Sequence, residues 1–342
     1  MRKKQIVWGV VLGVLGVVVL AAAVVLHTVT SLLNNADYMD EDNELGSPRP
    51  EQEEVVDFVP EDLSSLEVRG NNDYVTNYLL IGCDARGSSR GRADTIVLLS
   101  VNDATKTIRL VSLMRDLWVT VPALGYPTKI NAAYSHGGFE ALLDTVEANL
   151  CLDIDQAVRV DFTAFQNAID VLGGIDVYVD ERAARCIPKE DPGNPDSFAV
   201  ADDWVTQIRE PIGTTAGVYH LQGFQALSFC RLRKIYPDSD YSRTENQRRV
   251  IASLLVTAAE NPSKIYGVLS AILREVTLYR LPRSELLGIL LNAGQYLSYE
   301  IDTDYRLNYQ GSRTPSGASI LLLPDQEQQV MALHRALYSV EE

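Results

Sequence analysis

The sequence predicts an α/β domain with a mixed central β-sheet covered by helices on both faces, preceded by one transmembrane helix. Short aliphatic and β-branched runs typical of strands alternate with amphipathic segments typical of helices, which favours a sheet packed between helices. An apolar run without a charged residue lies close to the N-terminus. The later part of the chain, about 270 residues, is long enough for one large domain with a substantial core.

The apolar run covers residues 6–26, which is the length a helix needs to cross a bilayer. Basic residues at positions 2–4 precede it, and the segment that follows soon becomes acidic. The positive-inside rule therefore predicts a cytoplasmic tail at 1–5, a membrane helix at 6–27 and an extracytoplasmic domain after it. A cleaved signal peptide is the alternative, but its apolar part is usually shorter, about 7–15 residues.

The segment 28–72 is interpreted as a flexible acidic stalk, because it is rich in Asp and Glu and poor in apolar side chains. It carries most of the net charge of −16, so the predicted domain at 73–342 is much closer to neutral and can still bind anions. The chain has four cysteines, Cys83, Cys151, Cys186 and Cys230. None forms a C-x-x-C pair, so we expect buried thiols. One disulfide is the alternative, because the predicted compartment is oxidising.

The elements of the domain follow from side-chain periodicity and from glycine and proline positions. In chain order we expect strands at 77–82, 95–101 and 108–113, helices at 138–150 and 162–172, a strand at 175–179, a surface insertion at 183–217, helices at 261–275 and 283–297, a strand at 320–323 and a last helix from 324.

A first cluster of charged residues lies around the glycine-rich loop between the first two strands. It contains Asp84, Arg86, Arg90, Arg92 and Asp94, and Arg115 and Asp116 close the third strand. If the three strands form an antiparallel meander, these residues meet at one edge of the sheet. Two carboxylates suit Mg²⁺, and arginines present forks that match phosphate oxygens. Surface ion pairs on a hairpin loop are the alternative.

A second cluster lies further along the chain. Residues 221–227 are predicted to be helical and 229–234 extended, which would place Arg231 and Arg233 on one face. Ser242 and Glu245 have the spacing of a capping box, which predicts a helix with Arg243 in its first turn and Gln247 on the same face. A cation at a helix N-terminus is unfavourable unless an anion binds there. A salt bridge from Arg243 to Asp238 or Asp240 is the alternative.

Several sequence blocks together resemble the LytR-CpsA-Psr (LCP) family in their order and spacing. The blocks are LLIGCDARG, RADTIVLLSV, SLMRDLWVTVP, KINAAYSHGG, VDFTAFQNAIDVLGGIDVYV, LQGFQALSFCRLRK and DSDYSRTENQ. The resemblance runs from about residue 78 to residue 255, and the predicted arrangement of tail, membrane helix and outer domain is similar as well. It implies an LCP-like fold and a phosphotransferase of the Gram-positive cell envelope. Such enzymes move a teichoic acid, capsule or related glycopolymer from an undecaprenyl-diphosphate carrier to peptidoglycan.

The resemblance also implies roles for single residues. Asp84 and Asp94 would hold Mg²⁺, or Mn²⁺, against the diphosphate. The diphosphate site would be lined by Arg92, Arg115, Arg231, Arg233, Arg243 and Gln247, with Arg86 and Lys129 nearby and Asn131 in the same block as Lys129. The sequence departs from the family pattern at Met114, where proline is usual, and at Asn246, where arginine is frequent. Arg248 is about 200° away from Asn246 around a helix, so we do not expect it to replace that charge.

The expected reaction is attack of an acceptor sugar hydroxyl on the proximal phosphorus, assisted by metal and arginines, which releases undecaprenyl phosphate. Asp116 is a candidate general base, although a structural partner of Arg115 is an equal interpretation. The apolar face of the helix at 162–172 either walls a tunnel for the prenyl chain of this carrier or belongs to the ordinary core. Peptidoglycan and membrane lipid are the other expected partners, and no nucleic acid is expected. Two alternatives stay open: a non-catalytic protein that binds polyprenyl phosphates in a regulatory role, and a lipid-diphosphate hydrolase.

Overall fold

The computed structural model describes residues 30–31, 37–39, 58, 60–83, 92–154, 156–191, 210–238, 240–261, 263–264, 267–268, 271, 276–291 and 293–340. The predicted tail at 1–5, the membrane helix at 6–27 and most of the stalk at 28–72 lie outside these ranges. Asp84 and Arg86 of the predicted site lie outside them too. Within the ranges given, no helix is both long and apolar enough to cross a bilayer.

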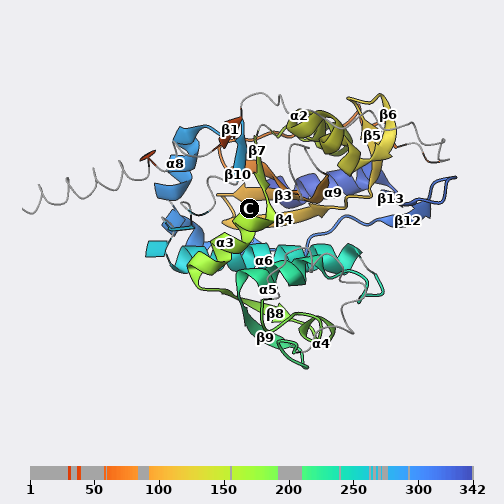
Figure 1. Ribbon diagram of the computed structural model, residues 1–342. Coiled ribbons are helices and arrows are strands. Elements are labelled where there is room, and N and C mark those ends of the chain that lie inside the picture. The colour runs from red at the N-terminus through yellow and green to blue at the C-terminus, as the bar shows by residue number, and fades with distance from the viewer. Residues whose placement is uncertain are drawn as a thin grey trace, which may run out of the picture.

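A mixed β-sheet forms the centre of the domain (Figure 1). In spatial order its described strands are β1 (Asp37–Met39), β10 (Val276–Tyr279), β7 (Gln156–Val160), β2 (Val75–Cys83), β3 (Ala93–Asn102), β4 (Thr107–Leu113) and β11 (Glu300–Asp302). Strands β2, β3 and β4 form the predicted antiparallel meander, whereas β7 runs parallel to β2. The prediction of a mixed sheet is confirmed.

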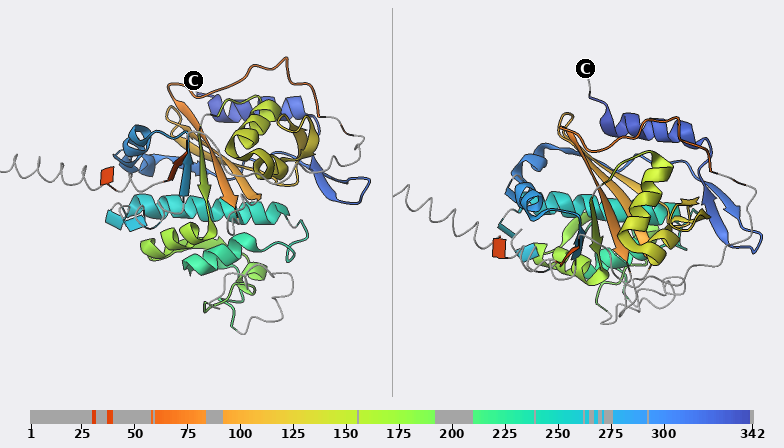
Figure 2. Two further views of the ribbon diagram at one scale, coloured as in Figure 1. Left: turned by 45° about the horizontal axis from the view of Figure 1, so that its top comes forward. Right: turned by 90° about the horizontal axis from the view of Figure 1, so that it is seen from above.

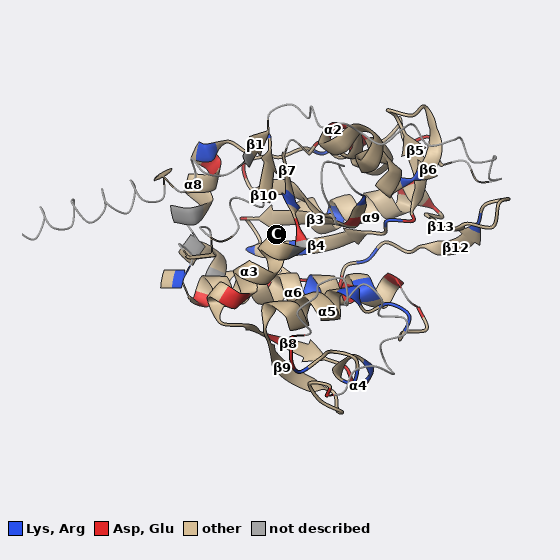
Figure 3. Ribbon diagram, viewed as in Figure 1, with Lys and Arg blue, Asp and Glu red and all other residues tan. Residues whose placement is uncertain are grey.

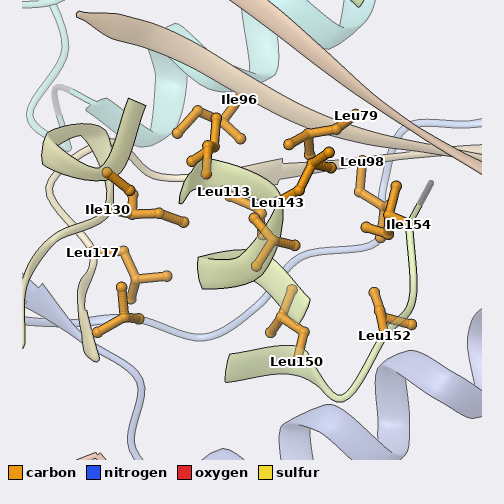
Figure 4. Packing of buried hydrophobic residues seen from close by; sticks show 14 of the residues in the cluster. Leu79, Ile96, Leu98, Leu113, Leu117, Ile130, Leu143, Leu150, Leu152 and Ile154 are labelled. Atoms are coloured by element: carbon orange, nitrogen blue, oxygen red, sulfur yellow. The ribbon is translucent and has the colours of Figure 1, made fainter. Parts of the chain in front are cut away.

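Helices cover both faces of this sheet, as predicted (Figures 1 and 2). On one face lie α2 (Ile130–Leu150) and α9 (Gln326–Tyr338), and on the other lie α3 (Phe162–Leu172), α5 (Gly223–Arg231) and α6 (Asp240–Glu260). The main hydrophobic core fills the space between the sheet and α2 (Figure 4). Alternating side chains of β2 divide between the two faces: Leu79 and Ile81 are buried in this core, and Leu80 points to the opposite side.

A smaller layer packs against the helices of the second face. The ribbon of β8 (Ile175–Val179) and β9 (Gly217–Leu221), with α4 (Glu181–Ala184), forms a second core with parts of α5 and α6. The predicted surface insertion at 183–217 is wrong at its start, because Ala183, Ala184 and Ile187 are fully buried in that core. Residues 192–209 of the insertion lie outside the described ranges.

Other predicted elements are confirmed with small differences. The helix expected at 138–150 starts at Ile130 and is kinked at Gly137 and Gly138, where Gly138 has a φ of 66°. The helix expected at 283–297 divides into α8 (Arg283–Leu291) and a 3-10 helix, η3 (Ala293–Ser298). Most of the helix expected at 261–275 lies outside the described residues. The remaining strands are β5 (Trp118–Val121), β6 (Tyr126–Lys129), β12 (Gln310–Arg313) and β13 (Ser319–Leu322).

No disulfide joins the four cysteines, and all four are buried, as the sequence predicts. Burial raises the pKa of Cys230 to about 12. This thiol therefore stays protonated near neutral pH, which excludes it as a thiolate nucleophile.

His220 on β9 joins the β8–β9 ribbon to the C-terminal end of α3. Its Nδ1 lies 2.7 Å from the carboxylate of Asp176, and its Nε2 lies 2.8 Å from the carbonyl oxygen of Gly173. Both neighbours are acceptors, so only the imidazolium can donate to both. The hydrogen bond to Asp176, followed by the one to Gly173, raises the pKa of His220 above its ordinary value.

This geometry predicts a pH-dependent contribution to stability. Because the pKa of His220 is higher in the folded state than in the unfolded state, protonated His220 stabilises the fold. This stabilisation is complete below the unfolded-state pKa of about 6.5, and it is lost as the pH rises through the folded-state pKa. The effect should stay below about 1 kcal/mol because the pair is exposed and screened. Urea unfolding of the parent and His220→Asn between pH 5 and 8 should show a difference that shrinks with pH. A difference that is constant with pH would contradict this role.

Candidate active site

A cavity of about 510 Å³ lies between the sheet and helices α3, α5 and α6. Most of its wall is apolar: Leu80, Val97, Leu99, Val160, Ala164, Phe165, Ala168, Leu227, Ile251, Leu254 and Leu255. The strand residues come from the face of β2, β3 and β7 that points away from the main core, which follows from the two-residue period of a strand. Three of the wall residues lie on α3, as one of the two interpretations of the segment 162–172 required.

One end of the cavity is charged. This charged mouth consists of Asp94, Arg115, Arg231, Arg233, Arg243 and Gln247. Asp94 and Arg115 come from the sheet edge, and the other four come from the end of α5, the loop after it and the start of α6. The two clusters found in the sequence therefore meet across one opening. In Figure 3, basic and acidic positions occur together on α6.

The face of α6 that lines the cavity changes from polar to apolar along the helix. Arg243, Gln247, Ile251 and Leu255 follow one another at intervals of four residues, so they lie on one helix face. Arg243 and Leu255 are separated by about 18 Å along the helix axis. The cavity is thus charged at one end and apolar over a long stretch away from it.

On the sheet side of the mouth, Arg115 binds Asp94. Arg115 Nη1 donates to Asp94 Oδ1 at 2.5 Å, and Arg115 Nε lies 3.9 Å from Asp116 Oδ2. Burial lowers the pKa of Arg115, but the hydrogen bond and charge of Asp94, with the charges of Asp116 and Asp240, raise it by more. Arg115 is therefore a permanent cation at this position.

On the helix side, Asp240 binds two arginines. Its Oδ2 lies 2.7 Å from Arg233 Nη2, and its Oδ1 forms an ion pair with Arg243 Nη2. Burial lowers the pKa of Arg243, and the charges of Arg115 and Arg233 lower it further. The salt bridge from Arg243 to Asp240 that the sequence left open is thus present, and Arg243 lines the cavity as well.

Several polar atoms of the mouth are buried and have no hydrogen-bond partner among the described residues. They are Arg115 Nε, Arg243 Nε and Gln247 Oε1. The amide nitrogen of Gln247 is 3.4 Å from the carbonyl oxygen of Cys230. Buried donors of this kind are normally satisfied, so the two Nε–H groups are suited to an anion that enters the mouth.

Two local predictions for this region are wrong. Arg231 is the last residue of α5 rather than part of an extended segment, because α5 continues through Phe229 and Cys230, which are buried in the second core. Ser242 does not cap α6, which begins at Asp240; its hydroxyl donates to Asp238 instead. The carboxylate of Glu245 pairs with arginines rather than with the helix start.

Other predicted site residues lie beside the mouth and are not part of the cavity wall. Arg92 is exposed immediately before β3. Asp116 accepts a hydrogen bond from Lys129 at 2.8 Å, which favours the structural interpretation of this carboxylate. Lys129 precedes α2, and the backbone N–H of Asn131 donates to the carbonyl oxygen of Arg115.

The two residues that depart from the family pattern do not line the cavity. Asn246 is 2% exposed, and its amide donates to the hydroxyl of Tyr236 at 3.2 Å. Arg248 donates to the carbonyl oxygen of Thr303 and to the hydroxyl of Ser112, so it does not replace a charge at the mouth. Met114 is buried.

The residues of the mouth can be tested as ligands for a divalent cation. The described residues contain no group of three or more His, Cys, Asp or Glu side chains placed to hold a metal. Asp94 offers one carboxylate among arginines, and the other predicted ligand, Asp84, lies outside the described ranges. This donor set fits Mg²⁺, which commonly uses one or two carboxylates together with phosphate oxygens of the ligand.

Sequence reasoning underestimated Asp240 and did not identify most of the cavity wall. Asp240 entered only as an alternative partner of Arg243, although its position three residues before that arginine was a usable signal. The wall residues on β2, β3 and α6 look like ordinary core residues in the sequence. Only the packing of three helices against the sheet leaves space beside them.

Comparisons with known proteins agree with this geometry. The model of the LytR_cpsA_psr family matches residues 30–332. A polyisoprenyl-teichoic acid–peptidoglycan teichoic acid transferase TagU from Bacillus anthracis is 30% identical over 278 residues, covering 81% of this chain and 79% of the relative. The crystal structure of B. subtilis TagV has a TM-score of 0.59 at 25% identity and covers 79% of this chain and 100% of that one. A structure of TagT bound to LI-WTA, with a TM-score of 0.61 at 24% identity, covers 78% of this chain and 90% of that one and shares the fold. The chain belongs to the LytR_cpsA_psr family.

Proposed function

We propose that this chain is a phosphotransferase that moves a teichoic acid or a related glycopolymer from an undecaprenyl-diphosphate carrier to peptidoglycan. The observation that carries the proposal is the cavity, whose wall is mostly apolar and whose charged mouth contains arginines together with Asp94. A prenyl diphosphate has two matching parts: a long apolar chain that suits the apolar wall and an anionic head that suits the charged mouth. The name of the TagU relative supports transfer of a teichoic acid in particular.

The residues of the mouth bind the diphosphate and neutralise charge as the reaction proceeds. The acceptor hydroxyl oxygen forms a new bond to the phosphorus that carries the glycopolymer. The bond from that phosphorus to the bridging oxygen breaks, and undecaprenyl phosphate leaves with the electron pair of that bond. Arg115, Arg233 and Arg243 stabilise the negative charge that develops on the phosphate oxygens. The hydroxyl proton is not assigned to a residue, since Asp116 is held by Lys129.

Mg²⁺ or Mn²⁺ is part of the proposal. Asp94, with Asp84, would hold the ion, which supplies positive charge next to the diphosphate oxygens. The chain is also proposed to be anchored in the cell membrane by residues 6–27, with its catalytic domain outside. The apolar cavity then receives the prenyl chain of a lipid from the same membrane.

The test uses the full chain in detergent micelles with an undecaprenyl-diphosphate-linked oligosaccharide, Mg²⁺ and peptidoglycan oligomers. Saccharide joined covalently to the glycan supports transfer. Free saccharide phosphate without that product would instead indicate a hydrolase. A bound but unchanged lipid would indicate a non-catalytic binding protein, and either of these outcomes would reject the proposal.

A further inference from the structure

Asp240 is placed unusually for an acidic residue at an anion-binding opening. It is the first residue of α6, its side chain is 17% exposed, and its two carboxylate oxygens pair with two different arginines. These are Arg233, from the loop before α6, and Arg243, from the first turn. A carboxylate in this place repels a phosphate and opposes its binding. Its presence therefore needs an explanation in some other property of the site that it improves.

The gain is a fixed orientation of the two guanidinium groups. Each arginine gives Asp240 its Nη2, and the buried Nε of Arg243 is left without a partner among the described residues. A guanidinium is a rigid planar fork, so holding one nitrogen restricts the direction of the other donors. Arg243 also lines the cavity, which places its unused donors at the opening.

The influence of Asp240 extends across the mouth. Its charge is one of those that raise the pKa of Arg115 on the sheet side. Arg115 and Arg233 in turn repel Arg243 and lower its pKa. Without Asp240, Arg233 and Arg243 would lose the carboxylate that holds them together, while Arg115 would keep Asp94 and Asp116. The flexible side chains of Arg233 and Arg243 would then be expected to separate.

We propose that Asp240 is a positioning residue that holds Arg233 and Arg243 in the orientation that stabilises the transferring phosphate. The inference rests on the proposed function, in which these arginines bind the diphosphate. Order gained before the substrate arrives keeps the arginine donors aimed at the charge that develops on the transferring phosphate. Asp240 therefore raises turnover while it lowers, or leaves unchanged, the affinity for the ground-state diphosphate.

The test compares the full-length parent with Asp240→Asn, Asp240→Glu and Asp238→Asn. Asp238 is the matched control, because it lies in the loop immediately before α6 and accepts a hydrogen bond from Ser242 instead of pairing with these arginines. Binding of inorganic pyrophosphate is measured by calorimetry and transfer from the lipid-linked oligosaccharide in single turnovers. Hydrogen exchange of the arginine Nε–H groups, followed by NMR, reports their order independently of activity.

For Asp240→Asn we expect pyrophosphate affinity that is unchanged or up to about tenfold tighter, because one like charge is removed. Turnover should fall on the order of 100-fold, as for a misplacement of about 1 Å, and the Nε–H of Arg243 should exchange faster. Asp238→Asn should match the parent. Asp240→Glu, which keeps the charge but moves it by one methylene, should keep the parent's affinity and lose part of the turnover.

Parent-like turnover in Asp240→Asn would overturn the inference, as would a loss of affinity that accounts for the whole loss of turnover. If Asp240→Asn does not fold, as judged by its melting temperature, Asp240→Glu carries the same comparison. A parent without transfer activity would reject the proposed function alone. The exchange and pyrophosphate measurements would then still decide whether Asp240 orders the two arginines.

Discussion

Replacing Arg243 with alanine is expected to weaken binding of the diphosphate lipid by about 10- to 100-fold. Among the arginines of the charged mouth that form the ion pairs described above, Arg243 has the lowest side-chain exposure, 11%, and its Nε has no partner among the described residues. Loss of a charge-assisted hydrogen bond to a buried phosphate corresponds to roughly 1.5–3 kcal/mol. Arg243→Lys should also be clearly impaired, because an ammonium cannot make the two-pronged contact.

Arg306→Ala is the matched control for this measurement. Arg306 pairs with Glu245, which lies on α6 as Arg243 does. The side chain of Arg306 is 43% exposed and does not line the cavity. An exposed pair of this kind contributes little, so both binding and stability should stay close to those of the parent. If Arg243→Ala instead lowers the melting temperature strongly and leaves lipid binding intact, Arg243 serves only as a structural partner of Asp240.

Replacing Asp94 is expected to have the largest effect on the reaction. Asp94→Ala should lower transfer by on the order of 100- to 1,000-fold, because a charged group that acts on the transferring phosphate is lost. The variant also removes the 2.5 Å partner of Arg115. If Asp84 and Asp94 hold one ion, the double variant should be hardly worse than Asp94→Ala alone, since residues that act as a unit are not additive.

The role of Asp94 toward the metal has its own readout. Removal of Mg²⁺ should lower the affinity of the parent for the diphosphate lipid and hardly change that of Asp94→Ala. Asp103→Asn is the control, because Asp103 lies in the turn between β3 and β4, at the opposite end of these strands, where it accepts a hydrogen bond from Tyr299. Full transfer activity in the presence of a chelator would exclude the metal role.

Much of the fold could be predicted because its signals are local. The bounds of α3 and β8 agree with the predicted 162–172 and 175–179, since an Asp cap at Asp161 and the Gly173-Gly174 pair mark where the helix begins and ends. The meander followed from short aliphatic strands, and it correctly brought Asp94 and Arg115 to one edge.

Predictions failed where burial overruled local composition. The segment around Ala183 has the polar surroundings of a surface loop, yet tertiary packing places it in the second core. Arg231 follows a helix whose last turn is buried, so the helix extends through a segment that was expected to be extended. At Asn246 the sequence indicated a missing charge beside the site, but the side chain faces Tyr236.

The sequence by itself determined the family resemblance, the three strands of the meander, the segment from α3 to β8, and the residue types of the charged mouth. These properties reside in periodicity, spacing and side-chain chemistry, which are present before the chain folds. Only the tertiary structure decided which face of α6 meets the sheet, and therefore that Arg243 and Gln247 line the cavity while Asn246 and Arg248 do not. The physical reason is that a helix presents every direction around its axis, and the partner against which it packs selects the face that becomes a site.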